Sequence, residues 1–168
     1  MNTDDHGPVL HATRIDLPAE IRMDIITLLN QTLAYTVDLC SQVKHACWNV
    51  KGKDFFPLQT VFTTIATTLD GYADLMAERI AILGGVVMGT IRMTALLSRL
   101  PEYVSTLVVG NDHVVALVER FALYAAVIRG SITRAADVED AGSAAVYTDI
   151  SRGGDKQLWI LESHLQRE

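Results

Sequence analysis

Two carboxylates four residues apart, Asp74 and Glu78, are the residues of this sequence that best combine chemistry with spacing. On a helix this spacing places both on one face, about 6 Å apart along the axis. Paired carboxylates repel each other unless a cation or a shared proton lies between them. Their oxygens are hard ligands that suit iron, manganese, magnesium or calcium. The spacing therefore predicts a cation site, with a solvated pair beside Arg79 as the alternative.

A helix must carry this pair, and apolar residues recur at three- and four-residue spacing along most of the chain, which is typical of amphipathic helices. Turn signals interrupt the pattern at 51–54, at 84–85 and around 138–143. The first expected helix runs from a cap at Asp16 to about Val50, and the second runs from Phe56 or Pro57 to Leu83. A short helix is expected from about Thr94 to Arg99. Two further long helices are expected, from Asn111 or Asp112 to about Ala136 and from about Ala144 to Leu165, the last with a weak point at 151–154. Four long helices and a short one in the central crossover predict an all-α, ferritin-like four-helix bundle. The long connector suits a bundle whose second and third long helices are parallel.

The composition fits a single domain over residues 1–168, in which residues 1–16 form a flexible N-terminal tail. Hydrophobic residues make up 49% of the 168. No apolar run reaches about 18 residues, the length of a membrane span, so no membrane association is expected. The first residues lack the basic and apolar regions of a secretory signal, which favours a cytoplasmic protein. Cys40 and Cys47, on one helix, would lie about 10 Å apart, too far for a disulfide.

The charge balance argues against a nucleic-acid partner. The net charge is −6, and segment 1–16 carries three aspartates against one arginine. Binding to a phosphate backbone relies on Lys and Arg side chains that displace counterions. DNA binding is therefore expected to be weak or absent.

Trp48 leads into a glycine turn, and an Asp-x-x-x-Glu motif ends within an Ala-Glu-Arg-Ile stretch. The stretch 47–85, which holds these features, resembles the core of the Dps family, dodecameric mini-ferritins that oxidise iron and shield DNA. RLPEY at 99–103 and DKQLWILESHLQ at 155–166 also look like the family, so the resemblance covers about 16–166. It implies a dodecameric cage of identical chains. It also implies iron ligands shared across a two-fold interface, where helix one and early helix two face late helix two of a partner chain.

Three of the five positions at which the family binds iron carry other residues here. Cys47 stands where the family usually has His, Gln59 replaces a second His, and Thr63 replaces an Asp. Gln59 and Thr63 are weak neutral ligands, and Cys47 is a soft ligand that favours zinc or copper over iron. The resemblance therefore leaves Asp74 and Glu78 as the catalytic and metal-binding residues of a weakened centre.

Helical geometry supports such sharing independently of the resemblance. Eleven residues separate Thr63 from Asp74, which is about 16 Å along a helix, so one helix cannot bring both to one ion. A two-fold axis crossing antiparallel copies of the helix can do so.

An acidic group lies at the turn between the third and fourth long helices. The resemblance implies that this region lines three-fold pores that admit cations, because a ring of carboxylates would focus cations toward the lumen. An ordinary solvated turn is the alternative. The members of the group are Asp137, Glu139, Asp140 and Asp149.

The expected function is that of a Dps-like mini-ferritin that binds, oxidises and stores iron and protects against oxidative stress, with a weakened ferroxidase centre. Iron, as Fe(II) and Fe(III), is the expected metal, with zinc or another divalent cation as the alternative. A metal-binding or structural cage without ferroxidase activity is the first competing function. A DNA-compacting protein is the second.

Overall fold

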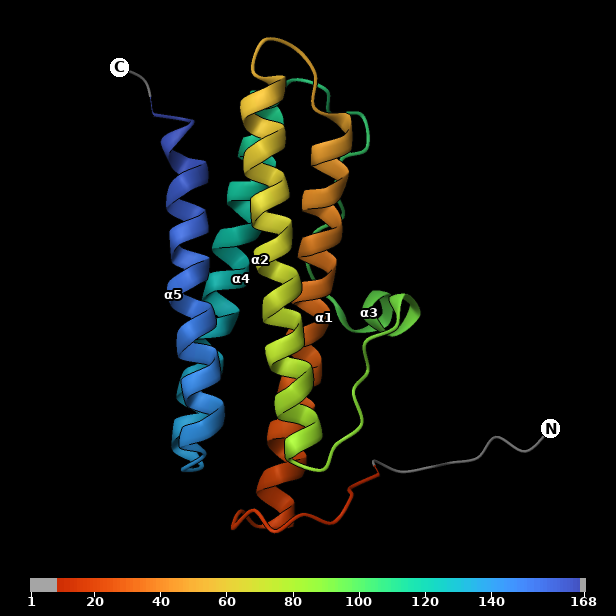
Figure 1. Ribbon diagram of the computed structural model, residues 1–168, viewed down its shortest axis with the longest axis vertical. Helices are drawn as coiled ribbons and strands as arrows, with labels where there is room; N and C mark the ends of the chain where they lie inside the picture. Colours follow the sequence, from red (N-terminus) through yellow and green to blue (C-terminus); the bar gives the residue numbers. More distant parts are fainter. Residues whose placement is uncertain (1–8, 167–168) are drawn as a thin grey trace, which may run out of the picture.

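The computed structural model describes residues 9–166, and over that range the chain forms five helices (Figure 1). They are α1 (Ala19–Asn49), α2 (Phe55–Ile82), α3 (Ile91–Leu97), α4 (Gly110–Asp137) and α5 (Ala141–Ser163). The four long helices lie side by side, while the short α3 stands out beside α1 (Figure 1). The connector after α2 returns along the bundle, so α2 and α4 run in the same direction. The all-α four-helix bundle with a short helix in its crossover is thereby confirmed.

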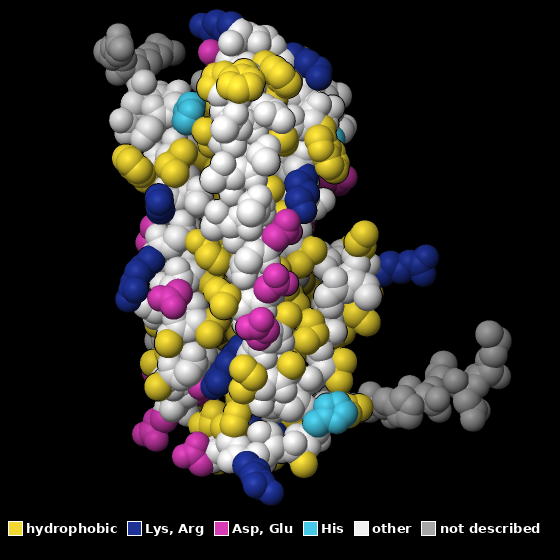
Figure 2. Space-filling model, viewed as in Figure 1, with side chains coloured by type: hydrophobic (Ala, Val, Ile, Leu, Met, Phe, Trp, Pro, Cys, Tyr) yellow, Lys and Arg dark blue, Asp and Glu magenta, His cyan; other side chains and the backbone are white. Residues whose placement is uncertain are grey.

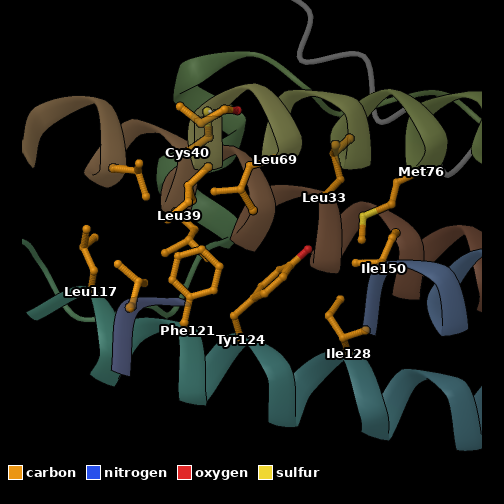
Figure 3. Packing of buried hydrophobic residues seen from close by; sticks show 14 of the residues in the cluster. Leu33, Leu39, Cys40, Leu69, Met76, Leu117, Phe121, Tyr124, Ile128 and Ile150 are labelled. Carbon is orange, nitrogen blue, oxygen red and sulfur yellow. Dashed lines mark hydrogen bonds between the residues drawn. The ribbon is translucent and has the colours of Figure 1, made fainter. Parts of the chain in front are cut away.

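An apolar core between the long helices holds the bundle together. Phe121 and Tyr124 pack edge to face, with ring centroids 6.4 Å apart. The hydroxyls of Tyr124 and Tyr147 each lie 2.9 Å from a threonine hydroxyl of α1, on Thr36 and Thr32 respectively. Because an unpaired buried hydroxyl costs stability, these bonds let polar groups lie in the core and connect α1 to α4 and α5. Figure 3 labels ten core residues: Leu33, Leu39, Cys40, Leu69, Met76, Leu117, Phe121, Tyr124, Ile128 and Ile150.

The start of α1 corrects the sequence expectation. Pro18 is the N-cap residue in place of Asp16, and no side chain caps the helix. The fixed φ of proline suits a position beside the first helical turn. Of the tail expected at 1–16, residues 1–8 lie outside the described part of the chain. Residues 9–16 form no helix, and the His11 N–H donates to the Gly84 carbonyl at 2.7 Å, which holds this segment against the end of α2.

Polar side chains fasten the crossover to the bundle. The helix α3 begins at Ile91, earlier than expected, because the Thr90 side chain caps it. Farther along, the buried guanidinium of Arg120 donates to Gln42 Oε1 at 2.5 Å and to the Glu102 carbonyl at 2.7 Å. Arg120 thus connects the crossover to α1 from its place on α4.

The helix α5 begins at Ala141, earlier than expected, and continues through 151–154 without a break. The expected weak point has a packing role, because a Cβ at Gly153 would lie 1.6 Å from the hydroxyl oxygen of Tyr72. Gly153 thus makes room for a side chain of α2, and α2 and α5 come close together there. Within residues 9–166, no helix is both long enough and apolar enough to cross a membrane.

Candidate metal centre

The helix α2 carries Asp74 and Glu78 on its exposed face, with Asp70 one turn earlier. Figure 2 shows acidic side chains in a column over this helix. The Arg79 guanidinium points to the turn before α5, where its Nη2 donates to Asp140 Oδ1 at 2.6 Å. Arg79 therefore does not supply the counter-charge that the sequence reading placed beside the pair, and the oxygens of Asp74 and Glu78 are open to a cation.

The three replaced ligand positions come together at the seam between α1 and α2. Cys47 Sγ lies 3.4 Å from Thr63 Oγ1, and it also lies 3.7 Å from the backbone carbonyl oxygen of Gln59. The Thr63 hydroxyl donates to the same carbonyl at 2.8 Å. These side chains are half-buried or exposed, and Trp48 beside them is 70% exposed. The Cys47 thiol and the Thr63 hydroxyl are thus hydrogen-bonded to each other and to the backbone carbonyl of Gln59, and none of these bonds uses the Gln59 side-chain amide.

The two sets of residues do not meet within one chain. Thr63 and Asp74 are eleven residues apart on one straight helix, a separation of about 16 Å. Over residues 9–166 there is no group of three or more His, Cys, Asp or Glu side chains that could hold a metal ion. A zinc site at Cys47 therefore finds no support in this chain. Any centre that uses both sets needs a second copy of the chain.

An ion pair lies between the two sets, and the sequence reading missed it. Lys44 Nζ of α1 lies 3.0 Å from Asp70 Oδ2 of α2, and the Cys40 thiol donates to Asp70 Oδ1 at 3.1 Å. Partial burial opposes ionisation of Asp70, but the hydrogen bonds from Cys40 and Lys44 hold the pKa of its carboxyl below the usual value. Burial, with Asp70 adding to it, raises the pKa of the Cys40 thiol to about 11, so Cys40 is a neutral donor.

The ion pair and the replaced ligand positions line the same small surface pocket of about 200 Å³. Lys44 and Asp70 share its lining with Cys47 and Thr63, which belong to the replaced ligand set. The signal in the sequence was the position of Asp70, one helical turn before Asp74 on the same face. Lys44 gave no such signal, because it lies on another helix.

The acidic turn before α5 is only partly available to a pore. Asp137, Glu139 and Asp149 are exposed, and Arg152 Nη1 donates to Asp149 Oδ1 at 3.4 Å. Asp140 is 2% exposed, so its assignment as a pore residue is corrected: both its oxygens are used inside the fold. Its Oδ2 accepts the Ser143 hydroxyl at 2.6 Å, and its Oδ1 accepts the Arg79 guanidinium.

Comparison with known proteins adds sequence relatives to this geometry. Residues 26–168 match the ferritin-like domain family. The chain is 35% identical over 158 residues to the "DNA protection during starvation protein" of Agrobacterium fabrum, with 94% of this chain and 98% of the relative covered. Such identity over nearly the whole of both chains shows common descent and not just a common fold.

Solved structures give the same result. A Dps protein from Vibrio cholerae O1 superposes with a TM-score of 0.87 at 25% identity, and the match covers 95% of this chain and 100% of that chain. It is described as a member of a broad superfamily of ferritin-like diiron-carboxylate proteins. Mycobacterium smegmatis Dps superposes with a TM-score of 0.88 at 27% identity and covers 93% of this chain and 94% of its own. The bundle and its crossover are thus shared over almost their full length.

Proposed function

The chain belongs to the Dps family of ferritin-like proteins, and from this premise we propose that it stores iron and oxidises it only slowly. The observation that carries the proposal is the unequal state of the two ligand sets. Asp74 and Glu78 are present and exposed, whereas Cys47, Gln59 and Thr63 stand in place of the family's two His and one Asp, and the Cys47 thiol and the Thr63 hydroxyl are hydrogen-bonded to each other.

The chemistry follows from what each set can contribute. Fe(II) is the substrate, and hydrogen peroxide or oxygen takes its electrons. Asp74 and Glu78 of one chain would bind Fe(II) through hard carboxylate oxygens. The facing Cys47, Gln59 and Thr63 of a second chain would add a thiol, an amide and a hydroxyl, none of which carries a fixed negative charge. Without the family's carboxylate at position 63, the centre should bind Fe(II) more weakly. It should also stabilise the Fe(III) product less, because a nearby negative charge favours the ion of higher positive charge.

Assembly into a closed dodecamer is part of the same proposal. The shared site needs a second copy, and the relatives cover 94% and 95% of this chain. In the cage, Asp137, Glu139 and Asp149 would line the cation pores as exposed carboxylates. Protection against oxidative stress and a cytoplasmic location come with the family role, and the free thiols of Cys40 and Cys47 support a reducing compartment.

A metal-free structural cage is the second candidate function. The Lys44–Asp70 ion pair and the hydrogen bond between Cys47 and Thr63 favour it, because they pair polar side chains of the centre without an ion. Iron loading separates the two functions. Apoprotein given Fe(II) and hydrogen peroxide should form Fe(III) that sediments with a particle of about twelve 18.4 kDa chains. Assembled particles that leave the iron in the supernatant would favour the structural cage.

Little DNA binding is expected at neutral pH. Twelve chains of −6 each give the cage a net charge of −72. Like charge on the cage and the DNA should outweigh scattered basic contacts, even with screening over a Debye length of about 8 Å at physiological salt. Plasmid mixed with the protein should therefore migrate unchanged in an agarose gel without divalent ions. A retarded band under those conditions would contradict this and favour the DNA-compacting function.

A further inference from the structure

A histidine is fully buried where α4 begins. His113 is 0% exposed, and its Nδ1 lies 2.8 Å from the hydroxyl oxygen of Tyr103 in the crossover. The two rings stack, with centroids 6.0 Å apart. Histidine is the side chain whose ordinary pKa places a change of charge between about pH 5 and pH 8. A buried histidine that binds a connecting segment can therefore make that contact depend on pH.

Residues 98–109 of the crossover form no helix, and they pass along α1 on the way to α4 (Figure 1). Hydrogen bonds from side chains and backbone fasten this 98–109 segment to the bundle. They join Gln42 Nε2 to the Pro101 carbonyl at 3.2 Å, Arg120 Nη2 to the Glu102 carbonyl at 2.7 Å, the Lys51 N–H to the Val108 carbonyl at 3.0 Å, and the Ser98 hydroxyl to Asp38 Oδ2 at 2.5 Å. None of these groups ordinarily changes charge between about pH 5 and pH 8, whereas an imidazole does. His113 is thus the hydrogen-bond partner of this segment that responds to pH in that range.

The side chains around Tyr103 bring positive charge to this contact. The Arg120 guanidinium lies 5.1 Å from the centroid of the Tyr103 ring, and an arginine side chain has no acceptor atom. His45 of α1 also contacts this ring, with centroids 5.2 Å apart and planes inclined at 59°. Neither side chain offers a negative charge that would stabilise a positive charge on His113.

A proton on His113 would find little compensation inside the fold. Nε2 of His113 is buried and makes no hydrogen bond within the described residues 9–166. The neighbouring carboxylates belong to Glu102 and Asp112, and both side chains are exposed to solvent, which screens their charge. A buried imidazolium without a paired carboxylate costs free energy, and that cost disappears when the group reaches water.

We propose that His113 and Tyr103 form an acid-sensitive latch, which holds the 98–109 segment against the bundle while His113 is neutral and releases it when His113 takes up a proton. Release lets the imidazolium reach water. A segment without helical hydrogen bonds also opens at a lower free energy than the bundle core. The latch needs no iron, so the inference goes beyond the proposed function, and the acid response and iron oxidation are measured separately.

The direction of the pH dependence follows from the environment of His113. Burial, and then the neighbouring imidazole of His45, hold the pKa of His113 below its ordinary value of 6.5, although the Asp112 carboxylate and the Leu107 carbonyl act in the opposite direction. In the released state His113 lies in water and regains that ordinary pKa. The released state therefore binds the proton more readily, so the latch is fully effective above pH 6.5 and weakens as the pH falls below it.

Tyr103 is not the group that responds to acid. Burial raises the pKa of its hydroxyl to about 12, with the Arg120 charge acting against the shift. The phenol therefore stays neutral throughout the range in which an imidazole titrates, and the change of charge belongs to His113.

Hydrogen exchange of the full-length, iron-free protein at about pH 7.5 and about pH 5.5 tests the latch, because most carboxylates stay ionised at both values. Protection factors, corrected for the intrinsic exchange rate at each pH, report opening. The amides of Lys51 and Leu107, which donate to carbonyls of the 98–109 segment, should lose protection about three- to tenfold in acid. The upper limit is about tenfold because a free histidine is one pH unit below its pKa of about 6.5. Amides around the buried Phe121 of α4 should keep their protection.

Matched variants assign the response to His113. His113→Asn keeps a hydrogen-bonding group beside Tyr103 but takes up no proton, so its protection factors should be the same at both pH values. His113→Gln is a second neutral variant with a longer side chain. Tyr103→Phe removes the hydroxyl and should lower protection of the segment already at about pH 7.5. His164→Asn removes an exposed histidine at the end of α5 and should respond to acid like wild type.

Each comparison is made between two pH values within one variant, so a variant with lower overall stability still decides the question. An acid-induced loss of protection that persists in both neutral variants of His113 would overturn the inference. Wild-type protection of Lys51 and Leu107 that is unchanged in acid would overturn it as well. A loss that is equally large around Phe121 would show global unfolding in place of a local release.

Discussion

Replacing Cys47→His, Gln59→His and Thr63→Asp together should speed peroxide-driven Fe(II) oxidation at least about a hundredfold, since even an outer-shell partner of a metal ligand is worth about 10–100-fold. The three positions are already neighbours, with Cys47 Sγ 3.4 Å from Thr63 Oγ1 and 3.7 Å from the backbone carbonyl oxygen of Gln59. In the proposed shared centre, the changes would add two imidazoles and a carboxylate that face the Asp74 and Glu78 carboxylates of a second chain. Stopped-flow absorbance of Fe(III) formation measures the gain in rate.

Two controls test whether the gain belongs to this centre. Glu78→Ala in the triple background should abolish it, because Glu78 supplies the carboxylate side of the site. A second control keeps Cys47→His and Gln59→His but has Thr64→Asp in place of Thr63→Asp. Thr64 is a neighbouring exposed threonine of α2, so this variant adds the same charge away from the ligand positions and should increase the oxidation rate much less. A wild type already as fast as the triple variant, with a rate that Asp74→Ala leaves unchanged, would place the chemistry elsewhere.

Asp140→Ala should lower the free energy of unfolding by about 2–4 kcal/mol. Asp140 is also the N-cap residue of α5, where its side chain accepts the Ser143 backbone N–H. Removing one partner of a buried ion pair costs about 3–5 kcal/mol and losing an N-cap costs about 1 kcal/mol, but Arg79 keeps access to water and so loses less. Asp140 is 2% exposed and receives hydrogen bonds from the Arg79 guanidinium and the Ser143 hydroxyl. Urea unfolding at matched protein concentration measures the change, because assembly makes stability depend on concentration.

The same experiment distinguishes a structural carboxylate from a pore carboxylate. Glu139→Gln and Asp137→Asn change exposed residues of the same turn and should shift stability by no more than about 0.5 kcal/mol. Arg79→Met combined with Asp140→Ala should cost less than the two single losses together, because the residues are in contact. If the Asp140→Ala variant is as stable as wild type and takes up iron more slowly, the result would support a role for Asp140 in the pore.

The sequence alone was sufficient for the bundle, and the residues of its metal centre stay a prediction from the sequence. Apolar residues at three- and four-residue spacing predict long helices, because each helix must bury one face. Helix boundaries were less predictable: Pro18 replaced Asp16 as the cap of α1, and α5 began at Ala141. Caps depend on local backbone angles that composition does not specify. Asp74 and Glu78 could be paired on one face because a single helical turn sets their spacing.

Only the tertiary structure decided what those residues touch. Lys44 and Asp70 are 26 residues apart on different helices, and the packing of α1 on α2 brings them together. Packing of α2 against the turn before α5 likewise turns Arg79 away from Glu78 and buries Asp140, which the sequence reading had placed at a pore. Periodicity reports which face of a helix is buried. Which charged side chains pair between two helices depends on how those helices pack against each other. The spacing of residues within one helix does not specify that packing.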